Sequence, residues 1–414
     1  MTRIHSYIRI LMIVTGLFTL AALSACGDDD SPTQPAATNP WSTDGFTWTA
    51  PFATDGSYPS DLQFRKVGNM VYLRGHANAG NTHVQSGQVI GTLPAGYCPT
   101  GNETVFLLGA TWGWPTAYPS GYVGTAGISI GTDGSITVRS VKQYDGEQQF
   151  LSFDSLAFST ASGSDGWSGD GIAWTDPYVA DGTYLSTLEY SVSGTMVRLQ
   201  GAANAGATRV TAGQQICTLP EGCRPPEGQA VHLLCATWGW PGSHPAGYVG
   251  TAGVIILPDG RVLVRTVQEY DGQQQFLKFD GQAFSTVTGA SGWSGDGIAW
   301  TAPYAPDEPY PSTLEINTGA DPVLLRGFAN AGGVRVSTGQ TVCTLPTGAR
   351  PPASVTPIML CPTWGWPAAS PAGYIGTAGM MLFPDGSLQV VTVQQFDAEQ
   401  QFVCFDGKGF SPAD

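Results

Sequence analysis

Short runs of alternating apolar and polar residues cover most of the chain after residue 40. In MVYLRG (70–75), Val71 and Leu73 alternate with more polar neighbours, which is typical of a half-buried strand. GQVIGTLP, TVFLLGA, AGISI, SITVRSV and QQFLSFD predict further strands, and the turn sequences TDG and PDG predict hairpins between them. No helical period of useful length occurs. The pattern therefore predicts an all-β fold.

The same pattern occurs three times in unbroken register. Trp48, Trp174 and Trp300 follow one another at intervals of 126 residues (174 − 48 and 300 − 174), and all twelve tryptophans fall at four sets of equivalent positions. With about eight short strands in each copy, we expect three tandem β-sandwich domains of jelly-roll type, at 41–166, 167–292 and 293–414. The three copies either pack as a single-chain pseudo-trimer, which makes the protein a monomer with three pseudo-equivalent domains, or lie as separate beads on a string.

The first 26 residues have the features of a bacterial export signal. Arg3 and Arg9 precede an apolar run that is short for a membrane span, and the run ends in Leu-Ser-Ala-Cys, a lipobox-like sequence. We expect a lipoprotein signal peptide over 1–26, lipidation of Cys26, and a disordered tether over 27–40. The alternative is an ordinary signal peptide that is cleaved near Ala25. Either signal predicts export, and the lipobox predicts anchoring to the envelope, at the outer membrane or the cell surface.

Composition and charge narrow the class of partner. Only 12% of the residues are charged, and the formal net charge is −15. This acidic balance argues against nucleic acid as a ligand and against electrostatic docking on anionic lipid. We therefore expect membrane attachment through the lipid anchor only.

Cysteines change together between the copies. Cys217 and Cys343 stand where the first copy has Gly91, and Cys235 and Cys361 stand where it has Gly109. The joint change predicts the disulfides Cys217–Cys235 and Cys343–Cys361 between neighbouring strands, with two buried free thiols in each copy as the alternative. Three further cysteines have no predicted partner, of which the last is expected to face solvent: Cys98, Cys223 and Cys404.

The case for catalysis is poor. The histidines share no equivalent position, so the copies have no common His-based triad. The other two copies also have aspartate at the positions equivalent to Asp145 and to Asp154. One interpretation is that the two aspartates of each copy form a catalytic carboxylate pair. The simpler interpretation is that the first aspartate ends a strand and the second caps a turn. We predict that the protein is not an enzyme and has no cofactor and no metal site.

The better candidate is the sequence Trp-Gly-Trp-Pro, which each copy carries before a conserved Gly-Tyr. Two indoles held by glycine and proline are able to present flat faces on which a sugar ring stacks, and a nearby aspartate accepts hydrogen bonds from hydroxyls. The alternative is that these rings are buried as packing between the copies. The candidate ligand-binding residues are Trp112, Trp114, Tyr122, Tyr144, Asp145, Trp238, Trp240, Tyr248, Tyr270, Asp271, Trp364, Trp366, Tyr374, Phe396 and Asp397.

Several of these segments, taken in order, resemble a known module. LQFRKVGNMVYLRGHAN, GQVIGTLPAGYCP, GTDGSITV and FLSFDSLAFS are similar to a module at the tips of phage tail fibres and baseplate proteins. The resemblance implies a β-sandwich that assembles in threes and contacts receptors on a host surface. The Trp-rich segment and the export signal are foreign to that module.

Two classes of function follow from the sequence. One is a lipid-anchored binding or display protein of the cell envelope, which recognises a carbohydrate or another surface ligand through the Trp-rich loops. The other is a structural, scaffolding lipoprotein in which those loops only pack the copies together. A hydrolase is a distant third.

Overall fold

The computed structural model describes most of the chain from Pro40 onward, within a compact unit from Asn39 to Asp414. The described residues are 40–52, 58–100, 104–114, 121–142, 147–161, 166–178, 185–240, 242, 246–268, 274–287, 292–304, 310–320, 322–366, 372–394 and 400–412. The predicted signal peptide, Cys26 and all but the last residue of the predicted tether lie outside them. No helix in the described ranges has the length and apolarity that a membrane span requires.

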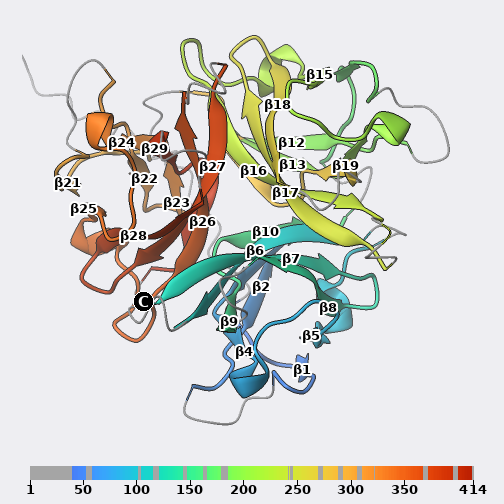
Figure 1. Cartoon of the computed structure of the whole chain (residues 1–414), viewed down its shortest axis with the longest axis vertical. Coiled ribbons are helices and arrows are strands. Elements are labelled where there is room, and N and C mark those ends of the chain that lie inside the picture. The colour runs from blue at the N-terminus through green and yellow to red at the C-terminus, as the bar shows by residue number, and fades with distance from the viewer. Residues whose placement is uncertain are drawn as a thin grey trace, which may run out of the picture. The chain divides into compact units, whose positions relative to one another are not determined.

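Within the described ranges, each repeat contributes ten strands and two short 3-10 helices, coloured in chain order in Figure 1. The first repeat contains β1 (Thr47–Trp48), β2 (Gln63–Val67), β3 (Met70–Arg74), β4 (His76–Asn78), η1 (Gly80–Thr82), β5 (Val89–Thr92), η2 (Ala95–Tyr97), β6 (Val105–Gly113), β7 (Tyr122–Ile130), β8 (Ser135–Lys142), β9 (Gln148–Ser152) and β10 (Leu156–Ser159).

The other two repeats contain the same elements in the same order. The second has β11 (Ala173–Trp174), β12 (Glu189–Ser193), β13 (Met196–Gln200), β14 (Ala202–Asn204), η3 (Gly206–Thr208), β15 (Gln215–Thr218), η4 (Glu221–Cys223), β16 (Val231–Gly239), β17 (Tyr248–Ile256), β18 (Arg261–Gln268), β19 (Gln274–Lys278) and β20 (Gln282–Ser285). The third has β21 (Ala299–Trp300), β22 (Glu315–Asn317), β23 (Val323–Arg326), β24 (Phe328–Asn330), η5 (Gly332–Val334), β25 (Thr341–Thr344), η6 (Thr347–Ala349), β26 (Ile358–Gly365), β27 (Tyr374–Leu382), β28 (Ser387–Gln394), β29 (Gln400–Cys404) and β30 (Lys408–Phe410).

Two antiparallel sheets enclose the core of each repeat. In the first repeat the large sheet has the order β1-β5-β8-β7-β6-β9-β4 and the small sheet the order β10-β3-β2. Side chains of both sheets meet in one buried cluster, to which Phe64 and Val71 of the small sheet and Ile128 and Val138 of the large sheet contribute. The prediction of an all-β fold with three tandem β-sandwiches is confirmed.

The central strands of the large sheets are apolar on both faces. In β6, Val105 and Leu107 point into the core of the first repeat, whereas Phe106 and Ala110 belong to clusters shared with other repeats. Alternation therefore gives way to a nearly continuous apolar run, as expected where both faces of a strand are covered. TVFLLGA is apolar for this reason.

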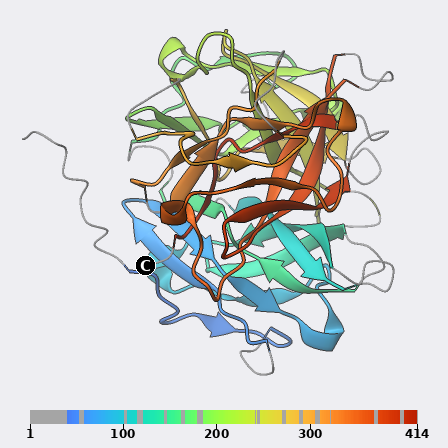
Figure 2. The same cartoon turned by 90° about the vertical axis from the view of Figure 1, so that its left-hand side faces the viewer.

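The three repeats close into a ring within this unit. The hydroxyl of Ser140 in the first repeat donates a hydrogen bond to the carbonyl of Val249 in the second. In the same way Thr266 of the second repeat donates to Ile375 of the third, and Thr392 of the third donates to Val123 of the first. The last contact returns from the third repeat to the first, so the set closes. β6, β16 and β26 contact one another near the centre of Figure 1, and Figure 2 shows the third repeat in front of the view, between the other two.

Close approach at the ring contacts requires glycine. A Cβ at Gly253 would lie 2.4 Å from the Cβ of Ile375, and Gly127 and Gly379 meet their neighbours in the same way. The shared apolar cluster draws on all three repeats, for example on Ala110, Leu234 and Leu360. The copies are therefore packed as a pseudo-trimer, and the separate-beads alternative is wrong.

The predicted disulfides are absent. All seven described cysteines, Cys217, Cys235, Cys343 and Cys361 among them, are buried free thiols. In the second repeat, β18 and β17 lie between β15, which holds Cys217, and β16, which holds Cys235. Three strand spacings amount to about 14 Å, whereas disulfides need Cα atoms within about 7 Å.

Packing bears on one of the two Gly-to-Cys changes that suggested those disulfides, the change at Gly91. A Cβ at Gly91 would lie 2.5 Å from the ring of Phe46 and 2.5 Å from the backbone carbonyl oxygen of Thr47, so the first repeat has room only for glycine there. The other repeats have Ile172 and Ile298 in place of Phe46, which removes the ring from this contact where Cys217 and Cys343 stand. Nothing in the structure explains the change from Gly109 to cysteine.

Thiol titration checks this correction. We expect the denatured protein, as the unit from Asn39 to Asp414 purified in air, to expose seven reactive thiols before reduction and the same seven after it. Only three reactive thiols before reduction, and seven after it, would contradict the structure and restore the two disulfides. The prediction that Cys404 faces solvent is also wrong, because this residue is 2% exposed in the cluster shared between repeats.

Candidate functional site

The two tryptophans of each Trp-Gly-Trp-Pro sequence have different environments. Trp238 and Trp364 are each 8% exposed, and Trp112 packs against the cluster shared between repeats. The second indoles, Trp114, Trp240 and Trp366, are 45%, 46% and 45% exposed. The first indole of each pair is therefore a packing residue, and the second is available to a ligand.

Local backbone structure causes this difference. The first tryptophan lies within β6, β16 or β26, and the register of the strand shifts at the glycine that follows it. The strand ends there, so the second tryptophan lies just beyond the sheet edge. A Cβ at Gly247 would lie 1.9 Å from the ring of Trp238, and this glycine has a φ of 94°, which explains why glycine precedes the conserved tyrosine.

Each exposed indole is held by other rings in the same geometry. The ring centroids of Trp114 and Trp112 lie 5.6 Å apart at 74°, and those of Trp114 and Phe150 lie 5.9 Å apart at 86°. The equivalent pairs in the other repeats have centroid distances of 5.6 Å and 5.9–6.0 Å. These ring contacts fix the orientation of each indole, and close to half of its surface stays exposed.

An exposed tyrosine extends the platform in two repeats. Tyr58 is 62% exposed and Tyr310 is 55% exposed, and their rings pack edge-on against Phe150 and Phe402 at centroid distances of 6.2 Å. We call each set of exposed Trp, supporting Phe and, where described, Tyr an aromatic platform. The sequence pattern did not point to these phenylalanines and tyrosines.

The conserved tyrosines after the Trp-rich segment lie elsewhere. Tyr122 and Tyr374 accept hydrogen bonds at their hydroxyl oxygens from Gln394 and Gln268 of neighbouring repeats, at 3.4 Å in both cases. They and Tyr248 begin β7, β27 and β17 and are half-buried. We therefore assign Tyr122 and Tyr374 to the contact between repeats. The remaining candidates lie outside the described residues: Tyr144, Asp145, Tyr270, Asp271, Phe396 and Asp397.

The aspartate that precedes the last strand of each repeat joins two repeats. Asp280 accepts hydrogen bonds from the backbone N–H of Gly201 in its own repeat, at 2.9 Å, and from that of Phe106 in the first repeat, at 3.2 Å. Asp154 accepts in the same way from Gly75 and from Ile358 of the third repeat. Sequence reasoning predicted a turn cap and missed the bond to the neighbouring repeat.

Burial shifts the protonation of these carboxyls. It raises the pKa of Asp406 to about 6, against the lowering effects of the N–H groups of Gly327 and His232 and of the nearby Arg326. Burial also raises the pKa of Asp154. A carboxyl whose pKa is higher in the folded state than in the unfolded state stabilises the fold when it is protonated. This contribution is fully present below the unfolded-state pKa of 3.8 and is lost as pH rises through the folded-state pKa.

A pH series on Asp406→Asn tests this linkage. From pH 4 to pH 7 we expect the wild type to lose up to about 3 kcal/mol of unfolding free energy relative to the variant, because only the wild type releases a proton there. Urea unfolding at closely spaced pH values measures the difference. A difference that stays constant between pH 4 and pH 7 would show that Asp406 is ionised throughout.

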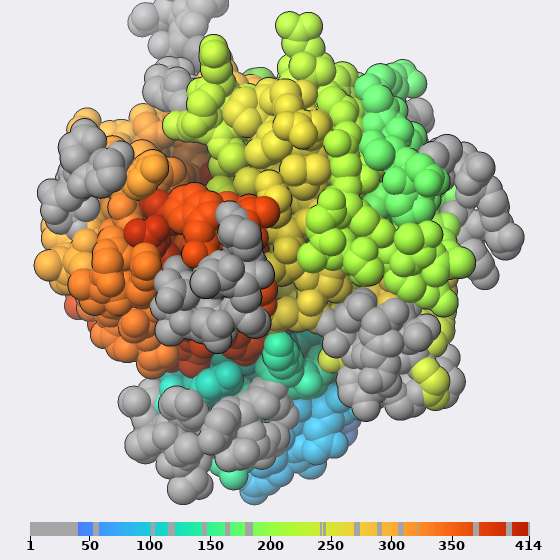
Figure 3. Space-filling model, turned by 45° about the horizontal axis from the view of Figure 1, so that its top comes forward, coloured from blue at the N-terminus to red at the C-terminus, as the bar shows by residue number. Residues whose placement is uncertain are grey.

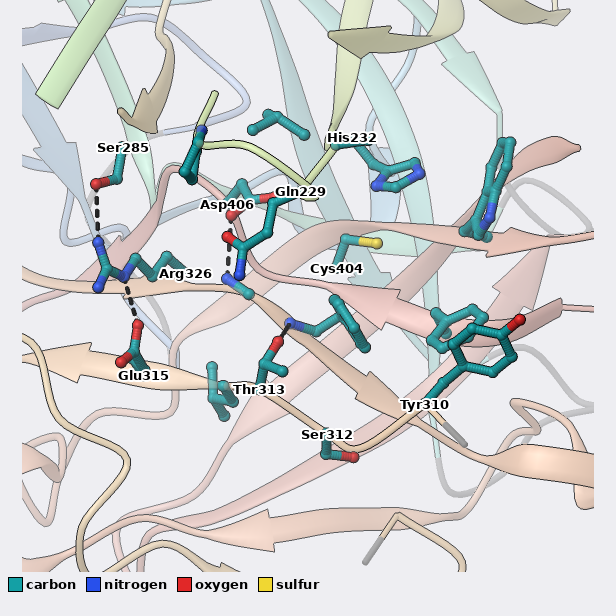
Figure 4. Close-up of a pocket in the computed structure, with 18 of the residues that line it drawn as sticks. Gln229, His232, Ser285, Tyr310, Ser312, Thr313, Glu315, Arg326, Cys404 and Asp406 are labelled. Atoms are coloured by element: carbon teal, nitrogen blue, oxygen red, sulfur yellow. Dashed lines mark hydrogen bonds and ion pairs between the residues drawn. The ribbon is translucent and has the colours of Figure 1, made fainter. Parts of the chain in front are cut away.

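A groove of about 680 Å³ lies between the second and third repeats. Figure 4 shows Arg326, Glu315 and Ser285 towards one end and Tyr310 at the other, with His232 and Cys404 between them. Trp364 and Trp366 line it as well. Arg326 is buried although it carries a charge, with 6% of its surface exposed.

The described residues include no group of three or more His, Cys, Asp or Glu side chains placed to hold a metal ion. No family model, no curated protein and no solved structure matches this chain. The resemblance to phage tail-fibre modules therefore depends on the sequence segments quoted above alone.

Proposed function

We propose that this chain is a carbohydrate-binding protein of the bacterial envelope, anchored by a lipid at Cys26, that presents three aromatic platforms to its ligand. One observation carries the proposal: Trp114, Trp240 and Trp366 are all close to half exposed, and supporting rings fix each of them in the same geometry. A fixed, open indole face is the apolar wall that a sugar ring requires. The export signal supports the location, and no catalytic role is proposed.

Three platforms on one chain favour multivalent binding. The ring contacts hold the repeats in fixed positions, so a polymer bound at one platform reaches the next without the entropy cost of a flexible linker. On the face in Figure 3 the surfaces of the three repeats adjoin one another. Weak sites that each bind one segment of a glycan would then combine into useful affinity.

A scaffolding role is the second candidate, and the first tryptophan of each pair favours it. Trp238 packs on Phe106 of the first repeat with ring centroids 4.5 Å apart, and Trp364 packs on His232 of the second repeat at 4.8 Å. These indoles hold the ring of repeats together. Burial of the first indole does not account for exposure of the second, which is why we place binding first.

A glycan array tests the proposal. We expect the wild type to bind a defined subset of glycans, and the Trp114→Ala/Trp240→Ala/Trp366→Ala variant to lose this binding. The matched control is Val67→Ala/Val192→Ala, which removes side chains that are 45% and 47% exposed but lie outside the platforms. Absence of wild-type binding to every glycan would favour scaffolding.

A further inference from the structure

The groove between the second and third repeats contains two buried polar atoms without a partner. Nη2 of Arg326 and Nε2 of His232 have no hydrogen-bond partner among the described residues, and both side chains line the groove. Buried polar atoms are nearly always hydrogen-bonded in folded proteins, to protein groups, water or ligand, so these two atoms are positions in one groove where a polar ligand can bind.

Arg326 is held rigidly for such a contact. Its Nε donates to Glu315 at 2.7 Å, and its Nη1 donates to the hydroxyl of Ser285 and the carbonyl of Val287, both at 2.8 Å (Figure 4 shows the first two). The guanidinium also lies 4.4 Å from the ring centroid of Trp293. Three of its contacts fix the plane of the group, and Nη2 remains as an oriented donor.

The equivalent groove between the first and second repeats is filled. There Phe106, Lys278 and Gln200 stand in place of His232, Cys404 and Arg326. The Lys278 ammonium lies 5.1 Å from the ring centroid of Phe106, and the remaining cavity is about 230 Å³. The smaller His232 and Cys404 side chains therefore open the groove between repeats two and three.

At the contact between the third and first repeats the polar pair is incomplete. Ile358 stands in place of His232 and cannot form a hydrogen bond through its side chain. Arg74 stands in place of Arg326, and its Nε donates to Gln63 at 2.7 Å. Among the described residues, the histidine, the arginine and an open volume come together in the groove between repeats two and three.

Charge in this groove argues against an anionic ligand. Glu315 pairs with Arg326 at 2.7 Å, and the carboxyl of Asp406 also lines the groove. Burial and the nearby Arg265 lower the pKa of His232 to about 3, so the imidazole is neutral at physiological pH. Burial likewise raises the pKa of the Cys404 thiol, which stays protonated. The groove thus has polar groups but no excess positive charge.

We propose that this groove is a single high-affinity site for a neutral oligosaccharide, an inference that rests on the proposed function and names its ligand class. One sugar ring stacks on Trp366 at the aromatic end. A hydroxyl of the chain hydrogen-bonds to Nε2 of His232, and another accepts from Nη2 of Arg326 at the far end. A volume of about 680 Å³ lies within the usual range for small-molecule sites, about 300–1,000 Å³.

Calorimetric titration of the purified protein with two panels of probes tests this proposal. The neutral panel contains gluco-, manno-, galacto-, xylo- and chito-oligosaccharides, and the acidic panel contains oligosaccharides of uronic acids. We expect the wild type to bind a neutral probe tightly at one site per chain. His232→Phe/Arg326→Gln, which installs the residues of the filled groove, should weaken this binding at least tenfold.

Further variants separate the groove from the platforms. Trp114→Ala/Trp240→Ala should retain the tight site, because neither residue lines the groove. Arg261→Gln, at a turn residue whose side chain is 48% exposed, is the matched control and should bind as the wild type does. If His232→Phe/Arg326→Gln does not fold, Cys404→Lys fills the groove instead and should weaken binding to a similar extent.

Each other outcome has a definite meaning. Equal neutral-probe binding by the wild type and the folded groove variant would overturn the groove site and leave platform binding intact. Tight binding of the acidic panel only would overturn the neutral ligand class. Absence of binding to both panels would overturn the proposed function, and the groove site with it.

Discussion

Alanine at Trp238 is expected to lower the free energy of unfolding by about 3–5 kcal/mol, the usual cost of deleting a buried aromatic side chain. The indole is 8% exposed and packs on Phe106 of the first repeat, so its loss leaves a cavity between two repeats. Urea unfolding followed by circular dichroism measures the effect.

Trp240→Ala is the matched control for this prediction. The second indole is 46% exposed, so its removal should cost less than about 1 kcal/mol. Equal losses in the two variants would show that both rings serve packing, and the binding role of the exposed indole would then have no structural support.

Asp280→Ala is expected to cost about 2–4 kcal/mol, because it leaves the buried N–H groups of Gly201 and Phe106 without an acceptor. Asp280→Asn keeps one acceptor oxygen but places an NH2 group opposite the other N–H, so it should cost less than alanine, about 1–3 kcal/mol. Thermal unfolding of both variants at pH 7 measures the difference. Similar stability of the alanine variant and the wild type would mean that this carboxylate does not join the repeats.

Much of the fold follows from the sequence, because hydrophobic alternation and turn residues act locally. Val71 and Leu73 in β3 point into the core as their spacing predicts. The unbroken repeat also makes a closed ring possible, since equal copies offer equal contacts. Ring closure itself depends on Gly127, Gly253 and Gly379 meeting side chains of other repeats, and no local pattern shows which surfaces meet.

The cysteine prediction failed because a joint substitution has more than one physical cause. Gly91 changes to Cys217 where Phe46, whose ring contacts Gly91, changes to Ile172. The sequence contained this signal at the equivalent position. A comparison restricted to cysteines could not separate a bond from a change in volume.

The candidate site was predicted in part for a similar reason. The Trp-Gly-Trp-Pro sequence identified the segment that carries the exposed indoles, but the burial of each indole depends on where the strand ends and on which side chains of the neighbouring repeat cover it. The groove depends on His232 and Arg326, which come from different repeats. The two side chains lie in one groove only because the three repeats close into a ring, and neither sequence segment alone predicts this.

The central claim is that the exposed indoles bind ligand while the buried ones hold the repeats together. Its most direct test is to titrate the strongest array ligand into the Trp114→Ala/Trp240→Ala/Trp366→Ala variant and to measure its thermal unfolding in the same buffer. We predict a thermal midpoint close to that of the wild type and loss of binding by at least tenfold. Wild-type affinity in this folded variant would contradict the claim.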